Sequence, residues 1–508
     1  MKKLSHLLLP IFIGIGGGLL SSQAYPDSAV WVAIFPAIAM VCYAVTKVSP
    51  RASLLVGFLA GLTWYASQIP WMTAYLGPVP WLALSILEAL IFAAGAYGLN
   101  LAHLFFKRHQ HTLWSTTLLA LSMASIWTAR EWLAYHWPYG GFPWSSVAMS
   151  QSASPFAGLA YWGGQPAITF SLVFMTALVL YGWRELNPIH WHGSLTSVLI
   201  LTVILFPALT PLNVDAQSGS LNVAAVQGNA NAGLFANEKP GSILQNHLAA
   251  SQPLLTAENH PDVIIWPENA ADLNPLVNAD AAWQITRFVN QSKVPLIFGT
   301  ITSRKSKLFN SSILWEPKVG ATDYYDKKRP VPFAEYVPDR SFWRMLAPDL
   351  IDLVTWGYDF GKRDGIFEVN HKKLGVMICF EVAIDEMSRD LVKQGASILV
   401  VQTNNSDFGH TNESAQQLAL AKLQAISTGR AVVNISTVGT SALIYPNGAV
   451  SAQLPAFKAG LMQQPLPLSS ELTPAVLYGE SLNLVINFSA LAQFGFLVWL
   501  RLIKPRRQ

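Results

Sequence analysis

The stretch Leu374-Gly-Val-Met-Ile-Cys-Phe-Glu381 decides the fold expected for residues 213–483. A short apolar run leads into Cys379, as in a buried strand, and Phe380 and Glu381 follow it. Comparable apolar runs alternate with helix-like segments on both sides of this stretch. The strand-like runs are 221–226, 263–266, 295–298, 374–378, 398–401 and 432–435, and the helix-like segments are 240–256, 278–292, 384–394 and 412–429. This alternation predicts an α/β layered domain.

The chain as a whole is too apolar to be entirely a water-soluble fold, and its long apolar runs lie outside residues 213–483. Apolar residues make up 52% of the 508 residues and charged residues only 12%, whereas soluble chains carry about 25% charged residues. A helix of about 20 apolar residues crosses a bilayer. Runs of this kind lie near 4–23, 28–46, 52–74, 80–106, 112–135, 164–183, 194–212 and 484–503. We therefore expect a seven-helix membrane domain over 1–212, the α/β domain over 213–483, and an eighth helix with a basic tail over 484–508.

The basic residues of the short loops predict how the chain crosses the membrane, because Lys and Arg favour the cytoplasmic side. If eight spans are drawn, all basic loops fall on one side, while the loops 24–27 and 75–79 contain no Lys or Arg. We expect both termini in the cytoplasm and the α/β domain on the far side. The first apolar run, between Lys2-Lys3 and Ser22-Gln-Ala24, could instead be a cleavable signal peptide, which would leave the α/β domain on the same side.

The net charge and the cysteine content exclude a nucleic-acid-binding function and a disulfide-stabilised fold. The net charge of +4 is small and scattered, so no nucleic-acid partner is expected. The chain has two cysteines, and Cys42 lies inside an apolar run, so a disulfide framework is not expected. Cys379 is then a free thiol. A lone cysteine after a buried strand is more often a core residue than a reactive one.

Two other side chains change that interpretation of Cys379. Glu268 follows the strand-like run that ends at Pro267, and Lys327 stands in Tyr325-Asp-Lys-Lys-Arg329. Each has a structural alternative, a loop acid for the first and a solvated basic face for the second. Strand ends of α/β sheets are where sites form, and a thiol needs a base or a cation to become a nucleophile. Glu268 could accept the thiol proton, and Lys327 could stabilise the thiolate and a developing oxyanion.

Three motifs together resemble the carbon–nitrogen hydrolase (nitrilase) superfamily. They are Trp266-Pro-Glu268, Lys327 eight residues before Glu335 in a Val-Pro-Phe-x-Glu context, and Ile378-Cys-Phe-Glu381. The flanking spans and Gly141-Phe-Pro-Trp144 resemble the apolipoprotein N-acyltransferase family within it. The resemblance implies an α-β-β-α sandwich in which Glu268 is the general base, Lys327 the oxyanion stabiliser and Cys379 the nucleophile. Glu335, Glu381 and Phe380 are implied as supporting residues. The sequence departs from the family pattern at Phe380, where Tyr is common, and near Asp407, where Trp is common.

The resemblance also implies a reaction at the bacterial inner membrane. A fatty acyl group would pass from a membrane phospholipid, through a Cys379 thioester, to the α-amine of the diacylglyceryl-cysteine of an apolipoprotein. No metal or cofactor is expected. An apolar arm over residues 338–362 would meet the bilayer surface, with ordinary core packing as its alternative. Two rival functions stay open from the sequence: a membrane-tethered amidase that uses water as acceptor, and a transporter or receptor whose site is vestigial.

Overall fold

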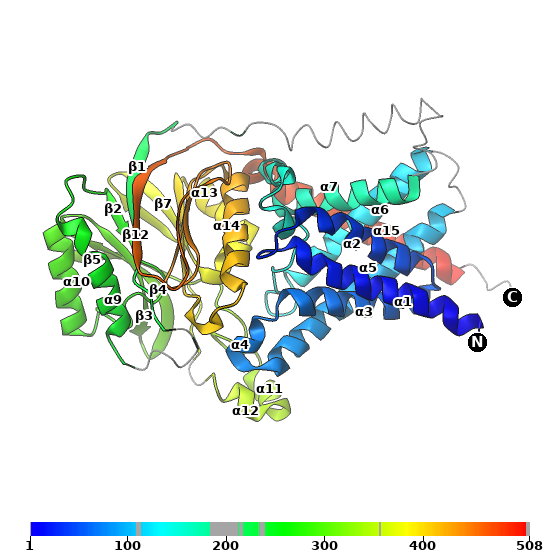
Figure 1. Ribbon diagram of the computed structural model, residues 1–508, viewed down its shortest axis with the longest axis horizontal. Helices are drawn as coiled ribbons and strands as arrows, with labels where there is room; N and C mark the ends of the chain where they lie inside the picture. Colours follow the sequence, from blue (N-terminus) through cyan, green and yellow to red (C-terminus); the bar gives the residue numbers. More distant parts are fainter. Residues whose placement is uncertain are drawn as a thin grey trace. The chain divides into compact units, whose positions relative to one another are not determined.

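The computed structural model describes residues 2–107, 113–182, 217–231, 239–354 and 357–503, together with residues 212 and 233. These residues fall into two compact units, and each unit is described by itself (Figure 1). The first unit is drawn from 1–73, 77–211 and 477–508, and the second from 74–76 and 212–476. The expected boundary at 483/484 falls inside the last helix, α15 (Pro474–Ile503). The seventh expected span, 194–212, lies outside the described residues except for its last residue.

Apolar helices build the first unit. Among the described residues, four segments are helical, long and apolar enough to cross a membrane: His6–Ala24, Pro78–Phe106, Pro155–Gly182 and Pro474–Arg501. The backbone of α7 departs from helical geometry at Gly163 and Gly164. The helices of this unit, besides α15, are α1 (Lys2–Ser21), α2 (Ile34–Thr46), α3 (Pro50–Gln68), α5 (Pro78–Phe106), α6 (Leu113–Ala134) and α7 (Ala160–Gly182), and the short α4 (Met72–Leu76) has residues in both units.

Small residues and buried hydrogen bonds hold these helices together. A Cβ atom at Gly57 of α3 would clash with Ala96 of α5, so the two backbones approach as closely as small residues permit. Glu131 of α6 is buried, and its carboxylate accepts hydrogen bonds from Thr169 Oγ1 at 2.9 Å and from the Val147 backbone at 3.1 Å. Arg130 Nη2 lies 3.4 Å from Glu131 Oε1, so the carboxylate also has an opposite charge beside it inside the unit.

Two six-stranded sheets build the second unit. The first has the order β12-β1-β2-β3-β4-β5 and the second β11-β10-β9-β8-β7-β6. Strands β1, β2 and β3 are parallel to one another, and so are β7, β8 and β9. The strands are β1 (Ser220–Gln227), β2 (Val263–Ile265), β3 (Leu296–Arg304), β4 (Lys307–Glu316), β5 (Gly320–Asp326), β6 (Ile366–Val369), β7 (Lys372–Ile378), β8 (Ile398–Thr403), β9 (Val432–Ser436), β10 (Ser441–Ile444), β11 (Val450–Leu454) and β12 (Gly460–Pro467).

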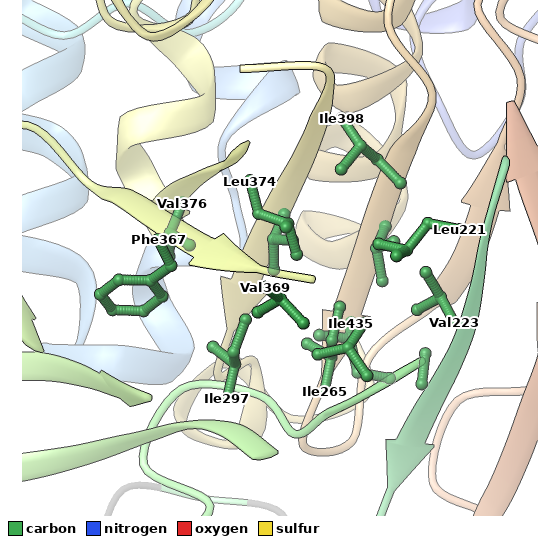
Figure 2. Packing of buried hydrophobic residues seen from close by; sticks show 14 of the residues in the cluster. Leu221, Val223, Ile265, Ile297, Phe367, Val369, Leu374, Val376, Ile398 and Ile435 are labelled. Carbon is green, nitrogen blue, oxygen red and sulfur yellow. The ribbon is translucent and has the colours of Figure 1, made fainter. Parts of the chain in front are cut away.

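Apolar side chains from both sheets share one core. Figure 2 shows Val223 and Ile265 of the first sheet with Val376, Ile398 and Ile435 of the second. Alternate residues of β1 point to opposite faces, as the pleat requires. One set enters this core, and the other set packs in a second apolar cluster beneath the helices that cover the first sheet.

Helices lie along the sheets. Residues of α9 (Ser242–Ala250) and α10 (Ala279–Ser292) enter the second apolar cluster with the first sheet. Helices α13 (Asp385–Lys393) and α14 (Glu413–Thr428) lie against the second sheet (Figure 1). The six expected strand-like runs coincide with β1, β2, β3, β7, β8 and β9, and the four helix-like segments with α9, α10, α13 and α14. The α/β prediction is therefore confirmed for this unit at the level of a layered fold built on sheets.

Part of the expected arm is helical. It contains α11 (Arg340–Leu346) and α12 (Pro348–Ile351), while residues 355 and 356 lie outside the described residues. Its apolar side chains at Met345 and Leu346 are exposed rather than buried, with 76% and 65% accessible to solvent. Ordinary core packing does not account for these positions, so the core alternative for the arm is wrong there.

Candidate active site

Cys379 follows the last residue of β7, at the start of a short 3-10 turn over Cys379–Ala383. Its φ angle is +53°, in the left-handed region that side chains other than glycine rarely adopt. A strained residue of this kind persists only where the surrounding structure holds it, and such residues are frequent at functional sites. The thiol is free and only partly buried.

Glu268 lies just beyond β2, where Pro267 ends the strand, and it is 5% exposed. Asn310 of β4 donates a hydrogen bond from Nδ2 to Glu268 Oε1 at 2.6 Å. Behind the residue, a Cβ atom at Gly299 of β3 would lie 2.6 Å from the Glu268 Cα. Only glycine therefore lets β3 pass this close, and the strand fixes where the carboxylate begins.

Lys327 follows the last residue of β5, and its ammonium group is held between two carboxylates. Its Nζ atom lies 2.8 Å from Glu335 Oε2 and 3.7 Å from Glu268 Oε1. The side chain is 1% exposed, so the charge depends on these partners instead of water. Strands β2, β5 and β7 thus bring to one region the carboxylate, the ammonium group and the thiol that the sequence singled out.

The surroundings set the protonation of the three groups. Burial raises the pKa of Glu268 to about 7, against the lowering effect of Lys327. Burial alone would lower the pKa of Lys327, but the carboxylates of Glu335 and Glu268 raise it above its ordinary value. Burial also raises the pKa of the Cys379 thiol well above its usual range; the Glu268 carboxylate adds to this and Lys327 opposes it. Before reaction the site therefore holds a neutral thiol, a cation and a carboxylate poised near neutral pH.

This arrangement suits attack by a thiol with base assistance. A neutral thiol must lose its proton as it attacks, and a carboxylate with a pKa near 7 is well matched to accept it. The buried ammonium group can stabilise negative charge on an attacked carbonyl oxygen. Within the described residues, no group of three or more His, Cys, Asp or Glu side chains could hold a metal ion.

The three supporting residues have different environments. Glu335 accepts a hydrogen bond from Asn310 Nδ2 at 2.8 Å and from the Val331 backbone at 2.7 Å, in addition to its ion pair with Lys327. Phe380 is 8% exposed and packs inside the domain. Both residues are held firmly, and Glu335 is the one whose charge acts directly on the lysine.

Glu381 is fully buried and surrounded by donors. It accepts from the Tyr325 hydroxyl at 2.9 Å on both oxygens, from the Ile378 and Lys328 backbones at 2.8 Å, and from the Arg329 backbone at 3.0 Å. Burial raises the pKa of this carboxyl group. The residue ties the turn at the nucleophile to the segment that follows Lys327.

The sequence did not single out the polar residues that approach the sulfur from α14. Gln417 donates a hydrogen bond from Nε2 to Cys379 Sγ at 3.5 Å. Asn405, which follows β8, donates at 2.8 Å to Gln417 and at 2.6 Å to Glu413. Asn405 belongs to the pair Asn404-Asn405 after β8, where asparagine is typical of a turn, and Gln417 lies in a helix whose polar residues have no distinctive spacing. Only the tertiary contact identifies them.

The comparisons with known proteins cover nearly the whole chain. The family model described as apolipoprotein N-acyltransferase N-terminal domain matches residues 17–178, and the carbon-nitrogen hydrolase model matches residues 222–471. An apolipoprotein N-acyltransferase of Mycolicibacterium smegmatis is 31% identical, over 95% of this chain and 84% of that protein.

A more distant relative extends this result. An apolipoprotein N-acyltransferase of Shewanella oneidensis is 26% identical, over 98% of this chain and 96% of its own length. Among solved structures, a nitrilase-superfamily amidase of Nesterenkonia is 15% identical, with a TM-score of 0.40 over 54% of this chain and the whole of that one. The curated relatives therefore match both the apolar part and the α/β part of the chain.

Proposed function

Because the chain belongs to the apolipoprotein N-acyltransferase family and is an acyltransferase enzyme with a carbon-nitrogen hydrolase domain, we propose the following acyl donor, acceptor and catalytic residues. The acyl donor is a membrane phospholipid. The acceptor is the α-amine of the N-terminal diacylglyceryl-cysteine of an apolipoprotein. Cys379 carries the acyl group between them as a thioester, with Glu268 as general base and Lys327 as oxyanion stabiliser.

One observation carries this proposal. The free thiol of Cys379 stands on a left-handed turn, close enough to Glu268 and Lys327 for both charges to act on its pKa. The base and the cation are themselves 3.7 Å apart. A core cysteine needs none of these neighbours, whereas a nucleophile for acyl transfer needs them all.

In the first half-reaction, Cys379 Sγ attacks the carbonyl carbon of the phospholipid ester and gives its proton to Glu268. An S–C bond forms, and the carbonyl oxygen becomes an oxyanion near Lys327. The C–O bond to the glycerol then breaks, and the departing oxygen takes the proton back from Glu268. A lysophospholipid leaves, and the enzyme holds a thioester.

In the second half-reaction, the lipoprotein amine attacks the thioester carbon. An N–C bond forms and the S–C bond breaks, while Glu268 passes one amine proton to the departing sulfur. The products are an amide on the lipoprotein and the original thiol. The two substrates use one site in turn, so ping-pong kinetics follow.

A second proposal concerns the membrane arrangement. The chain crosses the bacterial inner membrane eight times, with both termini in the cytoplasm and the two sheets forming an α-β-β-α sandwich on the outer side. The four long apolar helices and the one-sided distribution of Lys and Arg in short loops support this topology.

The exposed arm supports a lipid substrate. Its helix α11 presents Phe342, Met345 and Leu346 to solvent, with 49–76% of each accessible. Trp343 of the same helix packs edge-on against Phe333, two residues before Glu335, with ring centroids 5.3 Å apart. A helix that exposes apolar side chains and is linked in this way to the site suits an acyl chain delivered from a bilayer surface. An amidase for a water-soluble substrate has no use for it.

The test is to incubate the purified full chain with an alkyne-tagged phospholipid and to look for an adduct that hydroxylamine removes. We expect the adduct in the wild type and in Cys42→Ala, and none in Cys379→Ala. A diacylated lipopeptide should then discharge it as N-acyl peptide. Absence of an adduct in the wild type, or its persistence in Cys379→Ala, contradicts the thioester. Discharge by water as fast as by lipopeptide favours the amidase.

A further inference from the structure

A chain of polar side chains connects helix α14 with the sulfur of Cys379. Gln417 donates from Nε2 to Sγ at 3.5 Å, a distance appropriate for sulfur as an acceptor. Its own Oε1 accepts from Asn405 Nδ2 at 2.8 Å, and the same amide nitrogen donates to Glu413 Oε2 at 2.6 Å. Glu413, Asn405 and Gln417 are each at most 3% exposed. Because the three side chains are buried, the orientation of each side-chain amide is set by its hydrogen-bond partners in the protein.

The direction of these hydrogen bonds is determined by the partners of Asn405. Ser436 Oγ accepts from the Val438 and Gly439 backbones at 3.3 and 2.8 Å, so its hydrogen is left to donate to Asn405 Oδ1, 2.5 Å away. Thr403 Oγ1 lies 3.2 Å from the same oxygen of Asn405. The Asn405 amide group must then face α14, with one N–H directed to Glu413 and one to Gln417. Gln417 has to meet that donor with its oxygen, and so its own N–H groups face the sulfur. The network thus presents a donor, and not an acceptor, to Cys379.

A donor matters here because the surroundings of the sulfur are rich in carboxyl groups. Glu268 and Glu335 raise the pKa of the thiol, as does Glu413 when it is ionised, and Lys327 is the neighbour whose charge lowers it. Burial raises the pKa of Glu413 itself to about 8, so this group is mostly protonated at neutral pH. A neutral amide donor offers the thiolate a partner without adding another charge to a buried site.

We propose that Gln417 is a positioning residue for the reacting sulfur, oriented by Asn405 and Glu413. The amide N–H holds Sγ in place on its strained turn and stabilises the thiolate. In the first half-reaction it favours loss of the thiol proton to Glu268. In the second it favours departure of the sulfur as the S–C bond breaks. The proposal rests on the proposed function only in taking Cys379 as the nucleophile.

The experiment measures alkylation of Cys379 by iodoacetamide in the full chain between about pH 6 and 10, with the modified peptide quantified by mass spectrometry. Gln417→Glu keeps the oxygen that faces Asn405 and replaces the donor. Gln417→Leu removes the donor and adds no charge. Gln424→Glu is the matched control, because Gln424 is a buried glutamine seven residues further along α14 that donates to the Val382 backbone and to Asp385.

We expect both Gln417 variants to raise the pKa of the thiol by about one to two units, the size of a hydrogen bond to a charged group, and so to lower the alkylation rate at each pH of the series. Because a more basic thiolate is also more nucleophilic, the rate at a fixed pH should fall only about three- to tenfold. Gln424→Glu should lower the melting temperature and leave the profile in place.

Two results would overturn the proposal. One is an unshifted profile in Gln417→Leu, because a shift in Gln417→Glu alone reports only repulsion by an added carboxylate. The other is an equal shift in Gln424→Glu, which would reveal a general loss of packing. Alkylation needs no phospholipid, so the result is independent of acyl transfer. If the Gln417 variants slow alkylation as expected but the wild type forms no acyl adduct, the proposed function is contradicted. The positioning role of Gln417 toward the Cys379 sulfur then still holds.

Discussion

Replacing Glu268 by Gln should inactivate the site and also change how stability depends on pH. The amide has nearly the same shape and keeps an oxygen for the 2.6 Å hydrogen bond from Asn310. It cannot accept the thiol proton, so acyl-adduct formation should fall by about 10²- to 10⁴-fold. In the wild type, the acylation rate should rise as the pH passes about 7, because the base must be unprotonated.

The stability effect follows from the raised pKa. Burial raises the pKa of Glu268 from 4.5 to about 7, so between these values the folded chain holds a proton that the unfolded chain has lost. The stability that this proton provides is complete below about pH 4.5 and is lost as the pH rises through 7. For a shift of this size, the loss between pH 5 and 8 is on the order of 2–3 kcal/mol. The amide introduced by Glu268→Gln does not titrate, so the variant should escape this loss.

The assay compares melting temperatures of the two full-length proteins in detergent at pH 5 and pH 8. The variant should gain on the order of 2–3 kcal/mol on the wild type between the two conditions, roughly 5–10 °C for a domain of this size. Glu258→Gln makes the same exchange at an exposed position and should show no such gain. A melting difference for Glu268→Gln that is the same at both pH values would refute the reasoning, because Glu268 would then be charged throughout.

Three further predictions test other parts of the site and the arm. Gly299→Ala would put a Cβ atom 2.6 Å from the Glu268 Cα, so the base must shift and adduct formation should fall by about 10- to 100-fold; an unchanged rate would mean that the position of the base is not critical. Tyr325→Phe removes the hydroxyl that donates to both Glu381 oxygens at 2.9 Å, and the free energy of unfolding should drop by about 1–3 kcal/mol in denaturant titrations, with the adduct still formed. Met345→Asp places a charge at a 76% exposed apolar position; acylation from phospholipid vesicles should weaken severalfold while alkylation of the thiol is unchanged, and equal loss of both would contradict a lipid-contacting arm.

The parallel strands of both sheets could be predicted from sequence, and the antiparallel strands on either side of them could not. Strands β2, β8 and β9 are buried along their whole length, so they read as continuous apolar runs. Strands β5 and β11 at the sheet edges are largely exposed and carry mixed residues. Their strand conformation comes from pairing with neighbours and not from their own composition.

The site residues also differ in whether the sequence can identify them. Glu268, Lys327 and Cys379 stand directly after strands, where a one-dimensional pattern can mark them. Asn310 and Gln417 act through contacts between elements far apart in the chain, Asn310 with Glu268 at 42 residues and Gln417 with Cys379 at 38. No local spacing encodes those distances, so only the fold can reveal the two amides that orient the base and the sulfur.

The unequal sharing of Lys327 explains how the base of the proposed reaction stays basic. If the lysine paired closely with Glu268 alone, the ion pair would lower the pKa of that carboxyl group and weaken it as a proton acceptor. Glu335 instead holds the ammonium group at 2.8 Å, while Glu268 lies 3.7 Å from it, and the charge of Glu335 also raises the pKa of Glu268. The second carboxylate therefore does two things at once. It keeps a buried cation charged for the oxyanion, and it leaves Glu268 with a pKa near 7, where one residue can both accept and return a proton in each half-reaction.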